Sequence, residues 1–578
     1  MKKVIKTLCA ILLASSFAYA QEDFEFEGFG SDSSDGDFGG FDSDGFGSAS
    51  ADSEPALAWS GELAAKTRTW FNMKDGYDSM SDFFNSSTQQ NAYFRLGLDY
   101  SGSRSDISVK LKADTATIKE HPEDILEEAS IRGFFGNFTV EAGKMKNVWG
   151  KGDKVHVLDN FNANDYTDFI FPDYIDRRLS EVMLKASYAF PTDANIKIEG
   201  VYTPTMTADR FASSGILRPA RMANLESSVK SAISEQLGSA IATGNTSSIL
   251  NYASFNANDL YVDTNTLRFG QLGLRVTGTV GGFDWGASYY YGHIKQPSAN
   301  LYGIIAQTVY DTARAKAKAA AEAASIAAAQ YNTAGAQYTA AGNTAAAAAA
   351  YAAAAQYTVG AAQATAAAAN YGALAASSFS MPVLDYDAVQ VFGLEMATIL
   401  WKFNTRAEIA YNLTNDITGD DPWVKNNWFS WVAGFDIDLP IHNLNINIQE
   451  TGSIIVNHQN IGDRKIDLGN GTSYSLEKYD VDYNSDDCYH KNKIIFLLKD
   501  TFMNEKISLE LQGIWGIENK EFVLIPKFNI NVIDGLSFNA QIAYMYSDNE
   551  NGEFYQFTAA NTEHHNQLFV QLGAKYSF

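Results

Sequence analysis

The last eleven residues, Leu568-Phe-Val-Gln-Leu-Gly-Ala-Lys-Tyr-Ser-Phe578, show the pattern that decides the fold. Apolar side chains occupy every second position, and the positions between them are mostly polar or small. Because successive side chains of a strand point to opposite faces, this alternation predicts a strand with one apolar face. A strand of about ten residues is long enough to cross a bilayer when it is tilted.

The same alternation recurs from residue 57 to the chain end, for example at 107–112, 403–411 and 536–544. We predict an all-β, transmembrane antiparallel barrel of about 16–18 strands. The candidate strands begin near residues 57, 90, 104, 125, 137, 178, 194, 264, 282, 384, 403, 427, 444, 491, 505, 520, 535 and 565.

The connections between these strands alternate in length. Every other connection is a tight turn rich in Gly, Asn, Asp or Pro, such as Gly281-Gly282 and Asp534-Gly535. The others are mostly long, at 72–89, 115–124, 144–177, 204–263, 292–383, 413–426, 457–490 and 547–564. Short turns at one end and long loops at the other are typical of bacterial outer-membrane barrels, with the long loops extracellular.

The terminal strand, with Tyr576 and Phe578 at its end, resembles the C-terminal assembly signal of outer-membrane β-barrel proteins. The resemblance implies that the barrel assembly machinery reads these residues. The architecture from 57 to 578 resembles that of the bacterial porins, which implies a channel embedded in outer-membrane lipid.

Two different segments precede the barrel. Residues 1–20 have a Lys-rich start, an apolar stretch and the cleavage pattern Ala18-Tyr19-Ala20, which together predict a signal peptide. Residues 21–56 contain eleven acids, no Lys or Arg, and spaced Phe residues among Gly and Ser, which predicts a disordered tail. The tail is either a flexible linker or a peptide that docks on a periplasmic partner. An even number of strands places both termini in the periplasm.

Composition excludes several classes of protein. The chain has 43 Lys+Arg against 68 Asp+Glu and a formal net charge of -25, which argues against a nucleic-acid partner. Removal of the signal peptide leaves Cys488 alone, so the mature chain forms no internal disulfide. We expect no enzyme, because neither a Gly-x-Ser-x-Gly pattern nor a nucleophile with its base stands out.

If the apolar faces meet lipid, the opposite faces line the lumen. The pore-lining candidates are Lys66, Arg68, Arg95, Lys110, Lys112, Arg132, Arg275, Arg406, Glu408 and Glu510. So many charges are tolerable only in a water-filled channel or in a paired network. We therefore expect passive diffusion of small hydrophilic solutes. The alternatives are charges that pair into a plug, and a non-conducting surface barrel that acts as an adhesin or interaction protein through its long loops.

The 204–263 loop carries Arg210, Arg218 and Arg221, followed by an apolar three-and-four spacing that fits an amphipathic helix. It either folds inward as a constriction with the arginines as anion contacts, or packs over the barrel mouth.

Two other loops have distinctive compositions. Residues 302–380 form an Ala-rich insertion, with 35 alanines from Ala313 to Ala376, which predicts a helical hairpin or cap that decorates the surface. Alternating oxygen-bearing side chains in a second loop resemble the front half of a calcium loop, although Ser485 stands where Gly is required. These residues are Asp480, Asp482, Asn484 and Asp486. The choice is between weak calcium binding, the one cofactor considered, and a solvated acidic loop.

Overall fold

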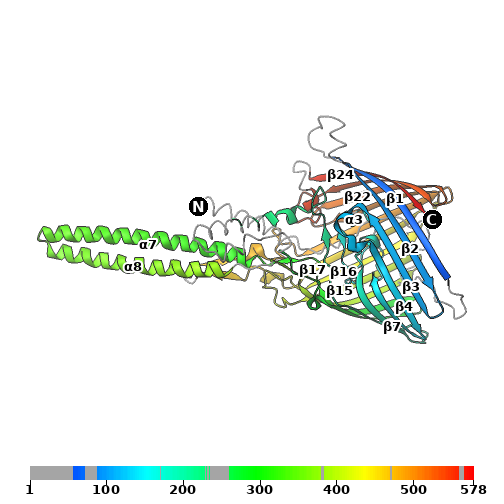
Figure 1. Ribbon diagram of the computed structural model, residues 1–578, viewed down its shortest axis with the longest axis horizontal. Coiled ribbons are helices and arrows are strands. Elements are labelled where there is room, and N and C mark those ends of the chain that lie inside the picture. Colours follow the sequence, from blue (N-terminus) through cyan, green and yellow to red (C-terminus); the bar gives the residue numbers. More distant parts are fainter. Residues whose placement is uncertain are drawn as a thin grey trace.

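The computed structural model describes residues 56–71, 88–169, 171–172, 174–224, 226–227, 230, 234, 260–378, 383–468, 471–558 and 565–578. Within this part of the chain, eighteen antiparallel strands form one sheet, which closes because β24 pairs with β1 (Figure 1). The predicted signal peptide, and the predicted tail up to residue 55, lie outside the described residues.

The strands follow one another around the barrel in chain order. The first nine are β1 (Ala56–Phe71), β2 (Thr88–Ser101), β3 (Ser105–Asp114), β4 (Leu126–Phe135), β5 (Phe138–Met145), β7 (Glu181–Ala189), β8 (Lys197–Thr203), β10 (Gln271–Val280) and β11 (Phe283–His293). The next nine are β14 (Ala388–Leu400), β15 (Phe403–Thr414), β16 (Trp428–Asp438), β17 (Asn445–Ile455), β20 (His490–Phe502), β21 (Ile507–Gly516), β22 (Glu521–Ile533), β23 (Leu536–Tyr546) and β24 (Asn566–Ser577). The predicted antiparallel barrel is thereby confirmed, and its eighteen strands fall within the predicted range of 16–18.

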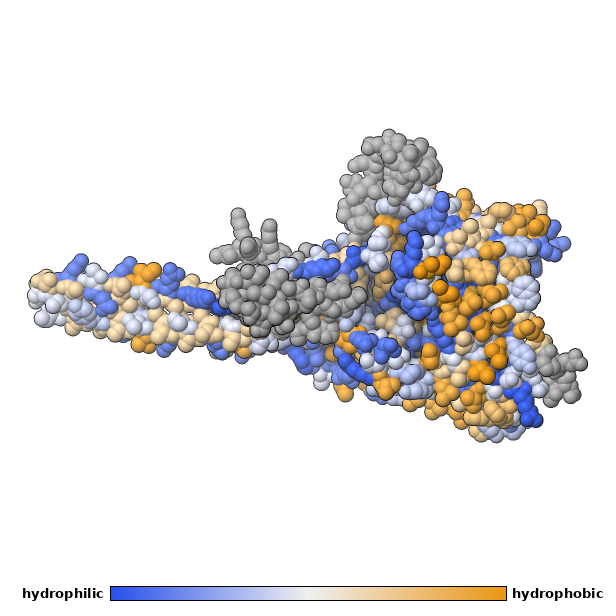
Figure 2. Space-filling view, in the orientation of Figure 1, coloured by the Kyte–Doolittle hydropathy of each residue, from blue (hydrophilic) through white to orange (hydrophobic). Residues whose placement is uncertain are grey.

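The outer surface of the barrel is apolar. Leu63, Leu274, Leu394 and Leu572 project outward with more than half of their side-chain surface exposed. Figure 2 shows the resulting band of apolar side chains over the strands. Exposure of so much apolar surface to water would be unfavourable, so the band is suited to lipid.

The short turns share one end of the barrel with both ends of the described chain, because Ala56 pairs with Ser101 beside the first turn. Gly281 and Gly282 both have positive φ, which explains why a two-residue turn there needs glycine. Residues 401–402 form a similar turn between strands that end at Leu400 and begin at Phe403, although the turn contains neither Gly nor Pro, and Trp401 adopts a φ of 59°.

Two long helices project from the opposite, long-loop end (Figure 1). They are α7 (Tyr302–Ala340) and α8 (Thr344–Ser378), which confirms the helical hairpin in the Ala-rich insertion. Alanines pack between the helices, including Ala328, Ala347 and Ala354. Among the described residues, none of the helices combines the length and apolarity that a membrane-spanning helix requires.

Candidate functional site: a segment folded into the lumen

The β5–β7 connection, residues 146–180, folds into the barrel instead of staying at its mouth. Trp149, Val155, Phe161 and Phe169 are at most 1% exposed. They pack against inward-facing residues of the wall; for example, the Phe161 ring meets Tyr290 of β11 edge-on at 5.1 Å. Burial of each large apolar side chain is worth about 1.5–3 kcal/mol, so the apolar composition of the segment explains why it leaves water.

Glu408 of β15 anchors the first half of the segment. Its carboxylate accepts hydrogen bonds from the backbone N–H groups of Gly152 and Val157 (2.9 Å for Val157), and it contacts His156 Nδ1 at 3.0 Å. Glycine is required at 152, because a Cβ there would lie 1.9 Å from the carbonyl oxygen of Val155. The close approach of backbone to carboxylate therefore depends on both residues.

The second half of the segment faces cations on β1 and β2. Asp168 accepts from Lys66 Nζ at 2.9 Å and pairs with Arg68, and Asp176 pairs with Arg95 at 2.5 Å. The side chains of Lys66, Asp168, Arg95 and Asp176 remain 25–38% exposed. Ion pairs that water still reaches thus join the segment to the β1–β2 wall.

These cations control the ionisation of the acids on the segment. Burial acts to raise the pKa of Asp168, but the charges of Arg68 and Lys66 outweigh it and hold the pKa well below its usual range. Burial is likewise outweighed at Asp176, where Arg95, Lys112 and Lys146 lower the pKa to about 2. Both acids are therefore ionised at neutral pH.

The ten predicted pore-lining residues all lie on strands of the wall, with side chains on the inward face. Nine of them have an oppositely charged neighbour or partner, and Glu408 instead accepts the backbone hydrogen bonds described above. Besides the pairs above, these are Lys110 with Glu128, Lys112 near Asp176 and Glu127, Arg132 with Glu141, Arg275 with Glu395, Arg406 with Asp153 and Asp436, and Glu510 with Lys499. The charges thus form a paired network. Within it, Arg406 and Glu408 also contact the folded-in segment and hold it in place.

The three predicted constriction arginines lie in the loop between β8 and β10, and not in the folded-in segment. Arg210 pairs with Asp124 and Asp165, Arg218 pairs with Glu226, and the buried Arg221 donates to the carbonyl oxygen of Glu550 in the last long loop. Arg210 thereby contacts the folded-in segment through Asp165. Most of the predicted helix at 222–241 lies outside the described residues, and the two alternatives for this loop stay predictions. The inward segment is 146–180. It is rich in aromatic and branched apolar residues, but the 204–263 loop also carries apolar residues and arginines, so composition alone does not single it out.

The proposed calcium ligands serve as links between loops. Asp482 accepts from the backbone N–H of Asn426, and Asp486 accepts from Asn549 and Asn551. In the described part of the chain, Asp480, Asp482 and Asp486 do not converge on one point where a single ion could contact all three. Asn484 accepts from the backbone N–H of Asp486, as in an Asx turn.

The two residues of the predicted assembly signal lie where the barrel closes. Phe578 and Gly61 exchange backbone hydrogen bonds of 2.8 and 2.9 Å. The Phe578 ring stacks on Tyr576 and meets Trp59 edge-on, with centroids 6.0 and 5.8 Å away. Such aromatic groups are typical of the edges of a membrane-spanning apolar band.

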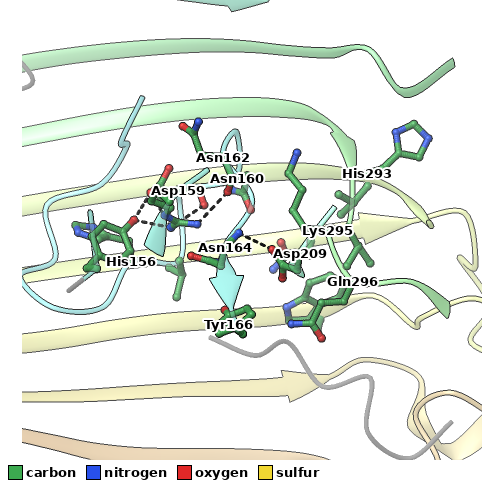
Figure 3. A pocket seen from close by; sticks show the side chains of 17 residues that line it. His156, Asp159, Asn160, Asn162, Asn164, Tyr166, Asp209, His293, Lys295 and Gln296 are labelled. Atoms are coloured by element: carbon green, nitrogen blue, oxygen red, sulfur yellow. Dashed lines mark hydrogen bonds and ion pairs between the residues drawn. The ribbon is translucent and has the colours of Figure 1, made fainter. Parts of the chain in front are cut away.

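A polar cavity of about 100 Å³ separates the segment from the wall formed by β11, β14 and β16 (Figure 3). The segment contributes Asp159, Asn160 and Arg178 to it, and neighbouring loops contribute Asp209 and Lys295. Burial raises the pKa of Asp209 to about 6 and lowers that of Lys295 to about 8.

Comparisons with known proteins bear on architecture. No protein-family model and no curated protein sequence matches the chain. Among solved structures, it is similar to Pseudomonas aeruginosa OccK11 (OpdR), with 8% identity over 91% of this chain and 96% of that one and a TM-score of 0.38. For Acinetobacter baumannii OccAB4 the identity is 8%, the coverage 91% and 98%, and the TM-score 0.40. The porin-like architecture rests on the strand pairing described above, which closes an 18-strand antiparallel barrel.

Proposed function

We propose that the protein is an outer-membrane channel for passive diffusion of small hydrophilic solutes. The observation that supports it best is the set of partly exposed charges, Lys66, Arg95, Asp168 and Asp176, inside a barrel whose outer face is apolar. Barrels of 16–18 strands enclose an aqueous channel unless a plug fills them. The segment 146–180 narrows the lumen, and the ion pairs that join it to β1 and β2 face the water that remains there.

Orientation and partners follow from this proposal. The short turns and both termini face the periplasm, and the long loops with α7 and α8 face outward. The tail at 21–56 is then available to a periplasmic partner, and the barrel assembly machinery inserts the protein through its terminal strand. The protein transports and does not catalyse.

One observation favours a second function. The α7–α8 hairpin comprises helices of 39 and 35 residues and extends well beyond the barrel (Figure 1). A non-conducting adhesin or interaction barrel would use such a projection as its contact surface.

Single-channel recording of the refolded mature protein in a planar bilayer distinguishes the two. We expect discrete current steps that scale with salt concentration. The double variant Lys66→Glu with Arg68→Glu should shift the reversal potential towards cation preference, because it inverts two luminal charges. Lys318→Glu on the exposed part of α7 is the matched control and should leave selectivity unchanged. A folded, heat-modifiable protein without current steps would refute the channel and favour the adhesin.

A further inference from the structure

The polar cavity between the folded-in segment and the wall contains groups that the protein leaves unsatisfied. Asp159 is 8% exposed, and its Oδ2 pairs with Arg178 at 2.7 Å, but its Oδ1 is buried without a hydrogen-bond partner. The amide Nδ2 of the adjacent Asn160 is also buried without a partner. Each unsatisfied buried group costs about 1–3 kcal/mol, more if charged, so this end of the cavity is built for a polar occupant.

The other end of the cavity offers cationic donors. Lys295 Nζ gives one hydrogen bond to Gln271 Oε1, at 2.6 Å, and an ammonium group has three to give. In Figure 3, Asp159 and Asn160 lie on one side, and Lys295 and Gln296 on the other.

The charges of the cavity balance. Asp159 pairs with Arg178, Asp209 lies near Lys295, and Val389, Ile294 and Trp428 provide apolar wall. A solute with a net charge would add an uncompensated charge to these lining residues, whereas a solute whose own charges sum to zero would leave their balance unchanged. Charge-assisted hydrogen bonds are roughly twice as strong as neutral ones, so a neutral solute would use the site poorly.

We propose that this cavity binds a small zwitterionic solute that carries one ammonium and one carboxylate group. The ammonium contacts Asp159 Oδ1 at one end of the cavity, and the carboxylate accepts a hydrogen bond from Lys295 Nζ at the other. The volume of about 100 Å³ suits a solute of a few heavy atoms. The inference rests on the proposed channel function in one respect only, which is that solutes reach this cavity on their way through the channel.

Binding is tested on the full mature protein refolded in detergent, with calorimetry or saturation-transfer NMR. The probes are glycine, which has both charged groups, and acetate and methylammonium, which have one each. We expect glycine to bind at least about ten-fold more tightly than either single-charge probe. Asp159→Asn and Lys295→Met, at opposite ends of the cavity, should each weaken glycine binding by a similar factor. Lys318→Met on α7 is the control and should have no effect.

Two results would overturn the proposal: glycine bound no better than acetate or methylammonium, or glycine binding that survives both cavity variants. Lys295 lies outside the folded-in segment, so its variant remains informative if Asp159→Asn disturbs that segment. Conductance is recorded separately. Current steps without glycine binding would refute the solute site and leave the channel proposal standing. Glycine binding without current steps would refute the channel proposal and leave the solute site standing.

Discussion

At the residue scale, Asp209 makes the lumen sensitive to pH. Burial raises its pKa to about 6, even though Asn164 donates a backbone hydrogen bond to its carboxylate. Above pH 6 the carboxylate is ionised and, together with Asp159, balances Lys295 and Arg178. Below pH 6 it takes up a proton, and the cavity gains net positive charge.

We therefore predict that the channel becomes more selective for anions as the pH falls from 7.5 to 5, with a change in permeability ratio of about two-fold. Reversal potentials in a salt gradient measure it. Asp209→Asn should behave at pH 7.5 as the unsubstituted protein does at pH 5, and should lose most of this pH response. An equal response in both proteins would assign the titration to another group.

At the scale of the element, the segment 146–180 depends on Glu408. Glu408→Ala leaves the buried backbone N–H groups of Gly152 and Val157 without their acceptor, at a cost of about 1–3 kcal/mol each. We predict larger and noisier single-channel currents, because the segment would leave the wall part of the time. The barrel should still form, because strand pairing uses the backbone and not this side chain.

Glu510→Ala is the matched control for that prediction. Glu510 is also a buried luminal acid, but it pairs with Lys499 on the adjacent strand β20. Currents from Glu408→Ala that match those from Glu510→Ala would show that the Glu408 contacts do not hold the segment in place.

At the scale of the whole molecule, closure depends on a close contact between the first strand and the chain end. A Cβ at Gly61 would lie 2.2 Å from the Phe578 ring, so any larger residue must displace that ring. We predict that Gly61→Val destabilises the closed barrel by about 1–3 kcal/mol, as overpacking does. The readout is the temperature at which the refolded protein loses its compact, heat-modifiable form on gels.

The double variant Gly61→Val with Phe578→Ala removes the ring that the valine meets. It should recover part of the lost stability, because the two single effects arise from one contact. No recovery, or an unaffected Gly61→Val, would contradict this account of closure.

The sequence by itself determined the wall of the barrel. The two-residue alternation at 403–411 or 568–578 depends only on neighbouring positions along the chain, and so do the Gly and Asn residues of the turns. A strand in the wrong phase would expose charged side chains to lipid and leucine side chains to water. The phase of each strand can therefore be predicted from its local sequence. Length and alanine content likewise predicted the α7–α8 hairpin.

Only the tertiary structure decided which segment fills the lumen that this wall encloses. The long loops at 146–180 and 204–270 both carry arginines and apolar residues, and local pattern does not tell which one folds inward. That choice depends on contacts far apart in sequence, such as Glu408 with Gly152 and Arg68 with Asp168, which are 256 and 100 residues apart. The paired charges and the polar cavity of the lumen form only when strands that are distant in sequence close around the folded-in loop. Burial inside the closed barrel then determines which charged side chains pair with one another.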